Sequence, residues 1–87
     1  MPKIEKEIIV RNLQGLHARP AALFVQTAAK FNSEIMIRKG EEIVNGKSIM
    51  GILMLGVQHL APIVVIANGD DAERAIIELE EFLSKNE

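Results

Sequence analysis

The strongest constraint on the fold is the order of seven short apolar segments, which switch between strand-like and helix-like patterns along 87 residues. Alternating or short, wholly apolar segments predict strands, whereas apolar residues three and four positions apart predict a helix. Strands are therefore expected in residues 3–10, in two halves of residues 34–46, and in residues 63–67. Helices are expected in residues 18–31, 48–55 and 70–85.

Turn and capping residues define where several of these segments begin and end. Pro20 is tolerated only in the first turn of a helix, so the first helix is expected to begin near Ala18. A hairpin turn is predicted at Lys39-Gly40, between the two strands of residues 34–46. Asp70 with Glu73 fits the D-x-x-E pattern of a capping box, which predicts the start of the third helix.

The resulting order, β-α-β-β-α-β-α, indicates a single α+β domain covering residues 1–87. A four-stranded sheet with its helices on one face is the simplest way to bury these apolar stripes. The pattern leaves the strand order open, because a ferredoxin-like arrangement fits the first six elements equally well. Metal chaperones of that shape usually need paired cysteines, and the chain has none.

Composition excludes several classes of function. The only aromatic residues are three phenylalanines, so a surface that stacks on nucleic-acid bases is not expected. Without cysteine there is no disulfide, thiol chemistry or cysteine zinc site. The apolar runs are too short to span a bilayer, and the start "MPKIEKEIIV" lacks the features of a secretory signal. We therefore expect a cytoplasmic protein without membrane insertion, direct nucleic-acid contact or a cofactor.

The stretch "GLHARPAAL" places His17 and Arg19 where the first helix begins. The first amides of a helix have no partner within it, and together with the helix dipole they attract anions such as phosphate. A neutral imidazole is a nucleophile that can accept a phosphoryl group, and Arg19 can donate to phosphate oxygens. Gly15 allows the tight approach that leaves the ring exposed. The alternative is that His17 only caps the helix and Arg19 is an ordinary surface residue.

Ser48 is the second candidate for modification. It precedes the short helix as an N-cap, and Gly56 follows as the C-cap. An ordinary cap is one interpretation; the other is regulatory phosphorylation, since a phosphate suits a helix N-terminus. Some of the apolar residues of this helix are expected to form an exposed patch, because they cannot all face inward.

His59 is interpreted as a structural or exposed loop residue. A zinc site pairing it with His17 would need at least one more ligand, and nothing in the sequence supplies one convincingly. No metal site is therefore expected.

In combination, "GLHARPAALFVQTAAKF" and "VNGKSIMGILMLG" resemble HPr, the histidine-containing phosphocarrier of the bacterial phosphoenolpyruvate-dependent sugar phosphotransferase system. The resemblance covers nearly the whole chain, including its length and element order. It implies an open-faced β-sandwich of four antiparallel strands with three helices on one face. It also implies a carrier with no turnover of its own, not an enzyme.

The resemblance carries over to particular positions. His17 matches the histidine that is phosphorylated on Nδ1 by enzyme I and that passes the phosphoryl group to the A components of sugar permeases (EIIA). Arg19 matches the arginine that attends the phosphate, together with the amides around Ala18. Ser48 matches the serine phosphorylated by HPr kinase/phosphorylase. The residues implied to dock partners are Ala18, Ile49, Met50 and Leu53.

The resemblance also implies partners and alternatives. Expected partners are enzyme I, EIIA domains and the kinase, with a catabolite-control transcription factor as a further candidate; a monomer is expected. Gln58–Pro62 departs from the polar, glycine-containing loop usual in the family, which leaves partner choice open. The alternatives are a carrier in the nitrogen-related phosphotransferase branch and a Ser48-phosphorylated adaptor without relay function. A regulatory paralogue lacking the histidine is disfavoured, because His17 is present.

Overall fold

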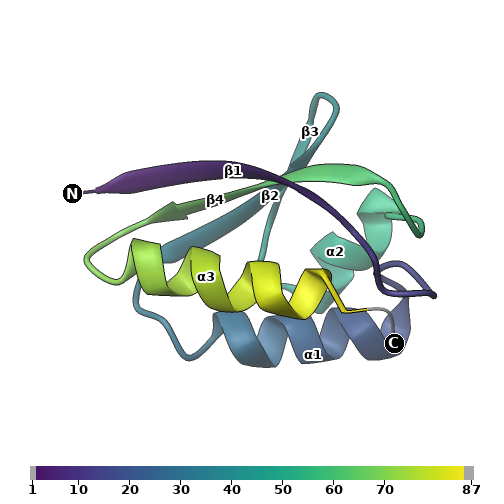
Figure 1. The fold of residues 1–87 in the computed structure, drawn as a ribbon, viewed down its shortest axis with the longest axis horizontal. Helices are drawn as coiled ribbons and strands as arrows, with labels where there is room; N and C mark the ends of the chain where they lie inside the picture. The colour runs from purple at the N-terminus through teal and green to yellow at the C-terminus, as the bar shows by residue number, and fades with distance from the viewer. Residues whose placement is uncertain (1, 86–87) are drawn as a thin grey trace.

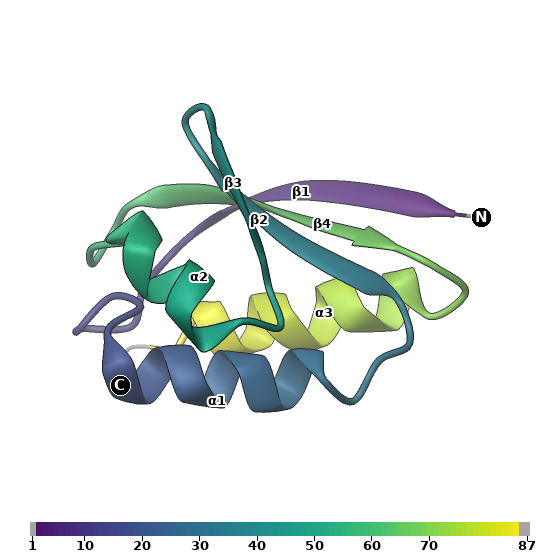
Figure 2. The same cartoon turned by 180° about the vertical axis from the view of Figure 1, so that it is seen from behind.

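Figure 1 shows the computed structural model, which describes residues 2–85. Its elements are β1 (Lys3–Ile9), α1 (Ala18–Ala28), β2 (Glu34–Lys39), β3 (Glu42–Asn45), α2 (Ile49–Leu55), β4 (Pro62–Asn68) and α3 (Ala72–Leu83). The four strands form one sheet, and all three helices lie on the same face of it (Figure 1, Figure 2). The expected α+β architecture and element order are confirmed. Within residues 2–85, no helix has the length and hydropathy needed to cross a membrane.

β4 takes a central place in the sheet, which the sequence pattern had left open. The strand order is β1-β4-β2-β3, and every neighbouring pair is antiparallel. β1 pairs with β4 along its whole length, from Lys3 opposite Asn68 to Ile9 opposite Pro62. A ferredoxin-like sheet has its third strand between the first and the second, whereas β4 lies there in this chain. The ferredoxin-like alternative is therefore wrong.

The core lies between the sheet and the helices. α3 buries five apolar residues: Ala72, Ala75, Ile76, Leu79 and Leu83. α1 buries Ala21, Phe24 and Ala28. Phe24 meets Phe82 edge to face, with ring centroids 6.2 Å apart. This aromatic contact joins the middle of α1 to the end of α3.

The start of α3 differs from the capping box predicted at Asp70. Asp71 occupies the N-cap position, and its carboxylate makes no capping hydrogen bond. It accepts instead from the backbone amides of Asn32 and Ser33, at 2.8 and 2.9 Å, and from the Ser33 hydroxyl. These hydrogen bonds hold the pKa of Asp71 below its usual value. The bond from the Ser33 hydroxyl lowers this pKa most, and the bond from the Asn32 amide comes next. The Asp71 carboxylate therefore binds the loop between α1 and β2 and does not cap α3.

The hairpin turn lies one residue later than predicted. Lys39 pairs with Glu42, so the two loop residues are Gly40 and Glu41. Gly40 has φ +60°, a conformation that glycine adopts without strain. The predicted hairpin is confirmed, and only its register is corrected.

Candidate functional site

His17 lies immediately before α1 and has extended backbone angles, φ −79° and ψ −168°. Its carbonyl oxygen accepts the first hydrogen bond of the helix, from the Ala21 amide at 2.7 Å. The imidazole makes no capping hydrogen bond, and the residue is exposed. The side chain therefore does not cap the helix, and the ring is accessible to another molecule.

The first turn of α1 has two outward-facing backbone amides. Pro20 has no amide hydrogen, and the Ala21 amide is already bonded to His17. The amides of Ala18 and Arg19 therefore remain without an acceptor inside the helix, as expected for the first positions. They lie at the positive end of the α1 dipole, directly after the His17 ring, where a negative charge is favoured.

The loop before His17 is held by a close backbone approach to residues 57–58. Gly15 has φ +63°, and a Cβ at this position would lie 2.3 Å from the carbonyl oxygen of Val57. The Leu16 amide donates to that same oxygen at 3.0 Å, and the Leu16 side chain is buried. Only glycine satisfies both the conformation and the contact at position 15. The position of His17 thus depends on the segment that follows α2.

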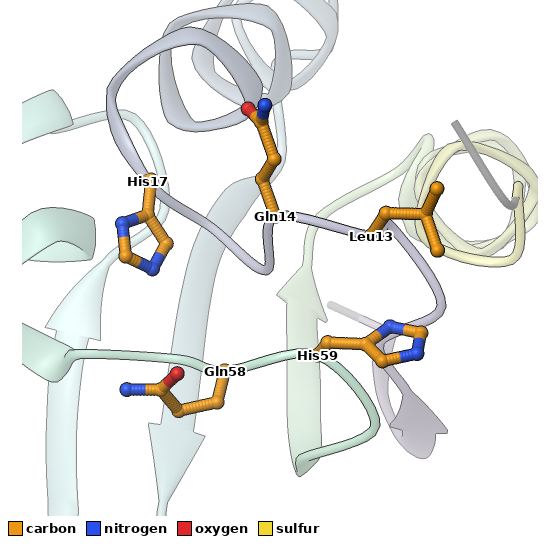
Figure 3. Close-up of a pocket in the computed structure, with 5 residues that line it drawn as sticks. All are labelled: Leu13, Gln14, His17, Gln58 and His59. Carbon is orange, nitrogen blue, oxygen red and sulfur yellow. The ribbon is translucent and has the colours of Figure 1, made fainter.

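A shallow pocket of about 290 Å³ lies beside His17 (Figure 3). It is lined by the loop before α1 and the segment after α2, through Leu13, Gln14, His17, Gln58 and His59. In Figure 3 the Gln58 amide lies next to the His17 ring, whereas the His59 ring points away from it. None of these lining residues is acidic, so a negatively charged group beside His17 meets no carboxylate in the pocket.

His59 is tied to the other loop through its ring. Its Nδ1 lies 3.2 Å from the Asn12 carbonyl oxygen. A carbonyl only accepts hydrogen bonds, so Nδ1 carries the hydrogen and donates it. His59 is thus exposed and also hydrogen-bonded, as the loop interpretation proposed. Within residues 2–85, no group of three or more His, Cys, Asp or Glu side chains is placed to hold a metal ion.

Arg19 is exposed and lines a different hollow from His17. That hollow, of about 370 Å³, also contains Leu23 and Phe82, and it shares Leu13 and Gln14 with the pocket beside His17. Among residues 2–85, Arg19 forms no ion pair with an acidic side chain. The two residues predicted to act on one phosphate therefore lie in adjoining hollows, and the guanidinium is not held by another charge.

Ser48 is the N-cap of α2, as predicted. Its Oγ accepts a hydrogen bond from the Gly51 amide at 3.0 Å, and its carbonyl oxygen accepts from Ile52 at 3.1 Å. Gly56 ends the helix in the left-handed conformation, with φ +62°. The side chain is half-buried, so the hydroxyl is both a structural cap and partly accessible to solvent.

The apolar residues of α2 divide between the core and the surface. Ile52 and Leu55 are buried, whereas the α2 patch (Ile49, Met50 and Leu53) is exposed. Met54 is also exposed, and so is Ala18 at the start of α1. The expectation that this helix leaves apolar side chains on the surface is confirmed. All the residues predicted to dock partners are accessible.

Sequence analysis missed Leu13, Gln14 and Gln58 as neighbours of His17. Leu13 and Gln14 are close to it in sequence, but no periodic pattern marks a loop residue as part of a pocket. Gln58 is brought there by the approach of Gly15 to Val57 and Gln58. The only available signal was Gly15 itself, because a glycine in a short loop often marks a close backbone contact.

Comparison with known proteins shows matches over nearly the full chain. Residues 4–85 match the family described as PTS HPr component phosphorylation site. The HPr-like protein Crh of Halalkalibacterium halodurans is 45% identical over 82 residues, which cover 94% of this chain and 98% of that protein. The phosphocarrier protein HPr from Bacillus anthracis has a TM-score of 0.93 at 40% identity, with 97% of this chain and 100% of that chain covered.

A third match is to Crh of Bacillus subtilis, whose crystal structure is described as a swapped, intertwined dimer. It has a TM-score of 0.78 at 38% identity, with 95% of each chain covered. The matches thus include both HPr and Crh. On the family match and these identities, the chain belongs to the HPr family of phosphocarrier proteins of the phosphotransferase system.

Proposed function

We propose that this chain is a cytoplasmic phosphocarrier, which accepts a phosphoryl group on His17 from phosphorylated enzyme I and passes it to EIIA domains of sugar permeases. The observation that carries the proposal is the exposed His17 ring at the start of α1, which is not used as a cap. The outward amides of Ala18 and Arg19 and a pocket without carboxylates support it.

The transfer is a displacement at phosphorus. The lone pair of His17 Nδ1 forms the N–P bond as the bond between phosphorus and the donor's atom breaks, and the donor keeps that electron pair. In the second transfer the acceptor attacks the same phosphorus and His17 leaves as neutral imidazole. The chain contributes positioning and donors for the phosphoryl oxygens, which is what phosphoryl transfer requires. Arg19 would supply its guanidinium from the adjoining hollow.

Ser48 would be the regulatory site, phosphorylated by HPr kinase/phosphorylase. A phosphate on Oγ keeps an acceptor oxygen for the Gly51 amide, which is now bonded to Oγ at 3.0 Å, so the cap need not be lost. The added charge would lie beside the α2 patch. An apolar docking surface is weakened by a neighbouring dianion, because the charge must lose water when a partner binds.

A second candidate function is a regulatory adaptor that acts through phosphorylated Ser48, with no relay role. The observation that favours it is the 45% identity to a protein named HPr-like protein Crh. In that case a transcription factor of catabolite control is the proposed partner. The two functions differ in whether His17 carries phosphate.

The test is intact-mass measurement after incubation with phosphoenolpyruvate and enzyme I, repeated after brief acid treatment. We expect the wild-type chain to gain one phosphoryl group that acid removes, as phosphohistidine does. His17→Ala should gain none, whereas His59→Ala, which removes the other of the two histidines, should still gain one phosphoryl group at the end point, whatever its rate. No gain on the wild-type chain, with a known HPr labelled in parallel, would contradict the relay and favour the adaptor.

A second arm of the same measurement uses ATP and HPr kinase/phosphorylase. We expect one acid-stable phosphate on the wild-type chain and none on Ser48→Ala. Ser84→Ala is the matched control, since Ser84 is an exposed serine at the C-cap of α3 and does not belong to α2. Equal labelling of Ser48→Ala and wild type would show that Ser48 serves only as a cap.

A further inference from the structure

Two buried polar side chains hold the two ends of α3. Among residues 2–85, only Asn12 and Ser33 combine a polar side chain with burial, at 4% and 1% exposed. The Ser33 hydroxyl donates to the Asp71 carboxylate at the start of α3. At the other end of the helix, Asn12 Nδ2 donates to the Phe82 carbonyl oxygen at 3.2 Å and to the Lys85 carbonyl oxygen at 3.5 Å. The last carbonyl groups of a helix have no partner within it, so Asn12 satisfies groups that the end of α3 leaves open.

Asn12 also begins the turn that leads to His17. The Gly15 amide donates to the Asn12 carbonyl oxygen at 2.9 Å, which closes a four-residue turn. His59 Nδ1 donates to the same oxygen at 3.2 Å. An asparagine that opens a turn often bonds to its own loop, whereas the Asn12 side chain reaches α3 instead. This residue thus ties the loop before α1 to the end of α3 and, through its carbonyl, to the segment after α2 (Figure 1).

The turn forms a wall that the two hollows of the site share. Its middle residues, Leu13 and Gln14, line both the pocket beside His17 and the hollow of Arg19. Asn12 lines the hollow of Arg19 and does not line the pocket beside His17. An effect of the Asn12 side chain on the His17 ring therefore acts through the turn. The position of the turn sets how the two hollows lie relative to each other.

We propose that Asn12 is a positioning residue for phosphoryl transfer on His17. This rests on the proposed function. The Asn12 side chain fixes the turn to the end of α3, so that the His17 ring and the Arg19 guanidinium can meet one phosphoryl group from adjoining hollows. Phosphoryl transfer depends on positioning and on donors aimed at the phosphoryl oxygens, so a small displacement of the turn slows it.

Two substitutions test the role of the Asn12 amide. Asn12→Asp keeps the shape of the side chain but loses both donated hydrogens, and Asn12→Ala removes the amide altogether. The rate of transfer from phosphorylated enzyme I is measured against carrier concentration, together with Tm. We expect kcat to fall about tenfold in both variants with KM little changed, because the His17 ring is displaced whereas the α2 patch is untouched. A wild-type kcat in both variants overturns the inference and leaves the proposed function intact.

Ser33→Ala is the matched control, because it removes the other buried polar tie of α3, at the opposite end of the helix from Asn12. It should lower Tm, as the Asn12 variants do, and leave kcat unchanged. An equal fall of kcat in Ser33→Ala would assign the effect to lost stability and overturn the inference. A rise in KM without a fall in kcat would assign Asn12 to docking, with the same consequence.

Amide hydrogen exchange reports the position of the turn directly. In both Asn12 variants the Gly15 amide, which is bonded to the Asn12 carbonyl oxygen, should exchange faster than in the wild-type chain. Ser33→Ala should not change this rate. Unchanged exchange at Gly15 in the folded Asn12 variants overturns the inference. No transfer to the wild-type chain, with a known HPr labelled in parallel, overturns the proposed function and this inference with it.

Discussion

Asp71 shows how one side chain can act far from where its sequence context places it. Its carboxylate accepts three hydrogen bonds from Asn32 and Ser33, about forty positions earlier in the chain. Ser33 is itself buried, and Gly69 packs so closely against it that a Cβ on Gly69 would lie 2.5 Å from the Ser33 Oγ. These contacts join the end of β4 and the start of α3 to the loop between α1 and β2.

We expect Asp71→Asn to lower Tm at neutral pH, because the amide replaces a charged acceptor of three hydrogen bonds. The pKa of Asp71 is lowered from 3.8 in the folded chain, so its stabilisation is complete above that value. It is lost as the pH falls through the lower, folded-state pKa. The difference in Tm between wild type and Asp71→Asn should therefore shrink below pH 3.8.

Asp70→Asn is the matched control for this prediction. Asp70 is exposed and adjacent, so the same change of charge should leave Tm nearly constant at every pH. Thermal unfolding followed by circular dichroism between acidic and neutral pH gives both curves. An effect of the same size in the two variants would show that net charge matters and that the Asp71 hydrogen bonds do not.

At the scale of elements, the loop before α1 and the segment after α2 act as a unit. Gly15 contacts the backbone of Val57 and Gln58, the Leu16 amide donates to Val57, and His59 donates to Asn12. The start of α1, with His17, is therefore positioned by a segment about forty residues away. Packing of α1 against α3 alone would not fix the position of the loop that carries His17.

Gly15→Ala and Gly40→Ala test this unit, because the two glycines share a φ near +60° but differ in surroundings. A Cβ on Gly40 meets nothing within 4 Å, whereas one on Gly15 overlaps the Val57 carbonyl. Gly40→Ala should cost about 1 kcal/mol, which lowers Tm by about 4–8 °C in a chain of this size. Gly15→Ala should lower Tm further and also slow phosphoryl transfer. If both variants lost the same Tm and transferred phosphate at the wild-type rate, the segment after α2 would not be needed to position His17.

At the scale of the whole molecule, the chain completes its own sheet and core. Its edge strands are poorly suited to pairing with another molecule. The edge strand β1 carries four charged residues, Lys3, Glu5, Lys6 and Glu7, and the other edge, β3, is only four residues long. Charged and short edge strands are recognised ways in which proteins avoid edge-to-edge association.

We therefore expect a monomer of 9.6 kDa by light scattering over a wide range of concentration. The contrary outcome is a stable dimer, and Crh of Bacillus subtilis is described as forming one by domain swapping. Swapping exchanges elements between chains and does not need a free edge, so charged edges do not prevent it. A dimer whose fraction is unchanged by dilution would contradict the prediction.

Much of this fold could be predicted from the sequence. The seven elements, their order, the start of α1 near Ala18 and the caps Ser48 and Gly56 are local properties, set by periodicity and by residues within one helical turn. The placement of His17 at a helix start followed from Pro20 in the same way. The topology and family were expected from resemblance, and the strand order could not be derived from periodicity.

Tertiary structure alone decided the features that depend on distant partners. The sequence by itself determined which residues form each element and that His17 stands before a helix, because those signals act over a few residues. The pocket beside His17, the separate hollow of Arg19 and the bonds of Asp71 all require segments far apart in sequence to meet. Such contacts depend on how the helices pack on the sheet, and no local pattern specifies that packing.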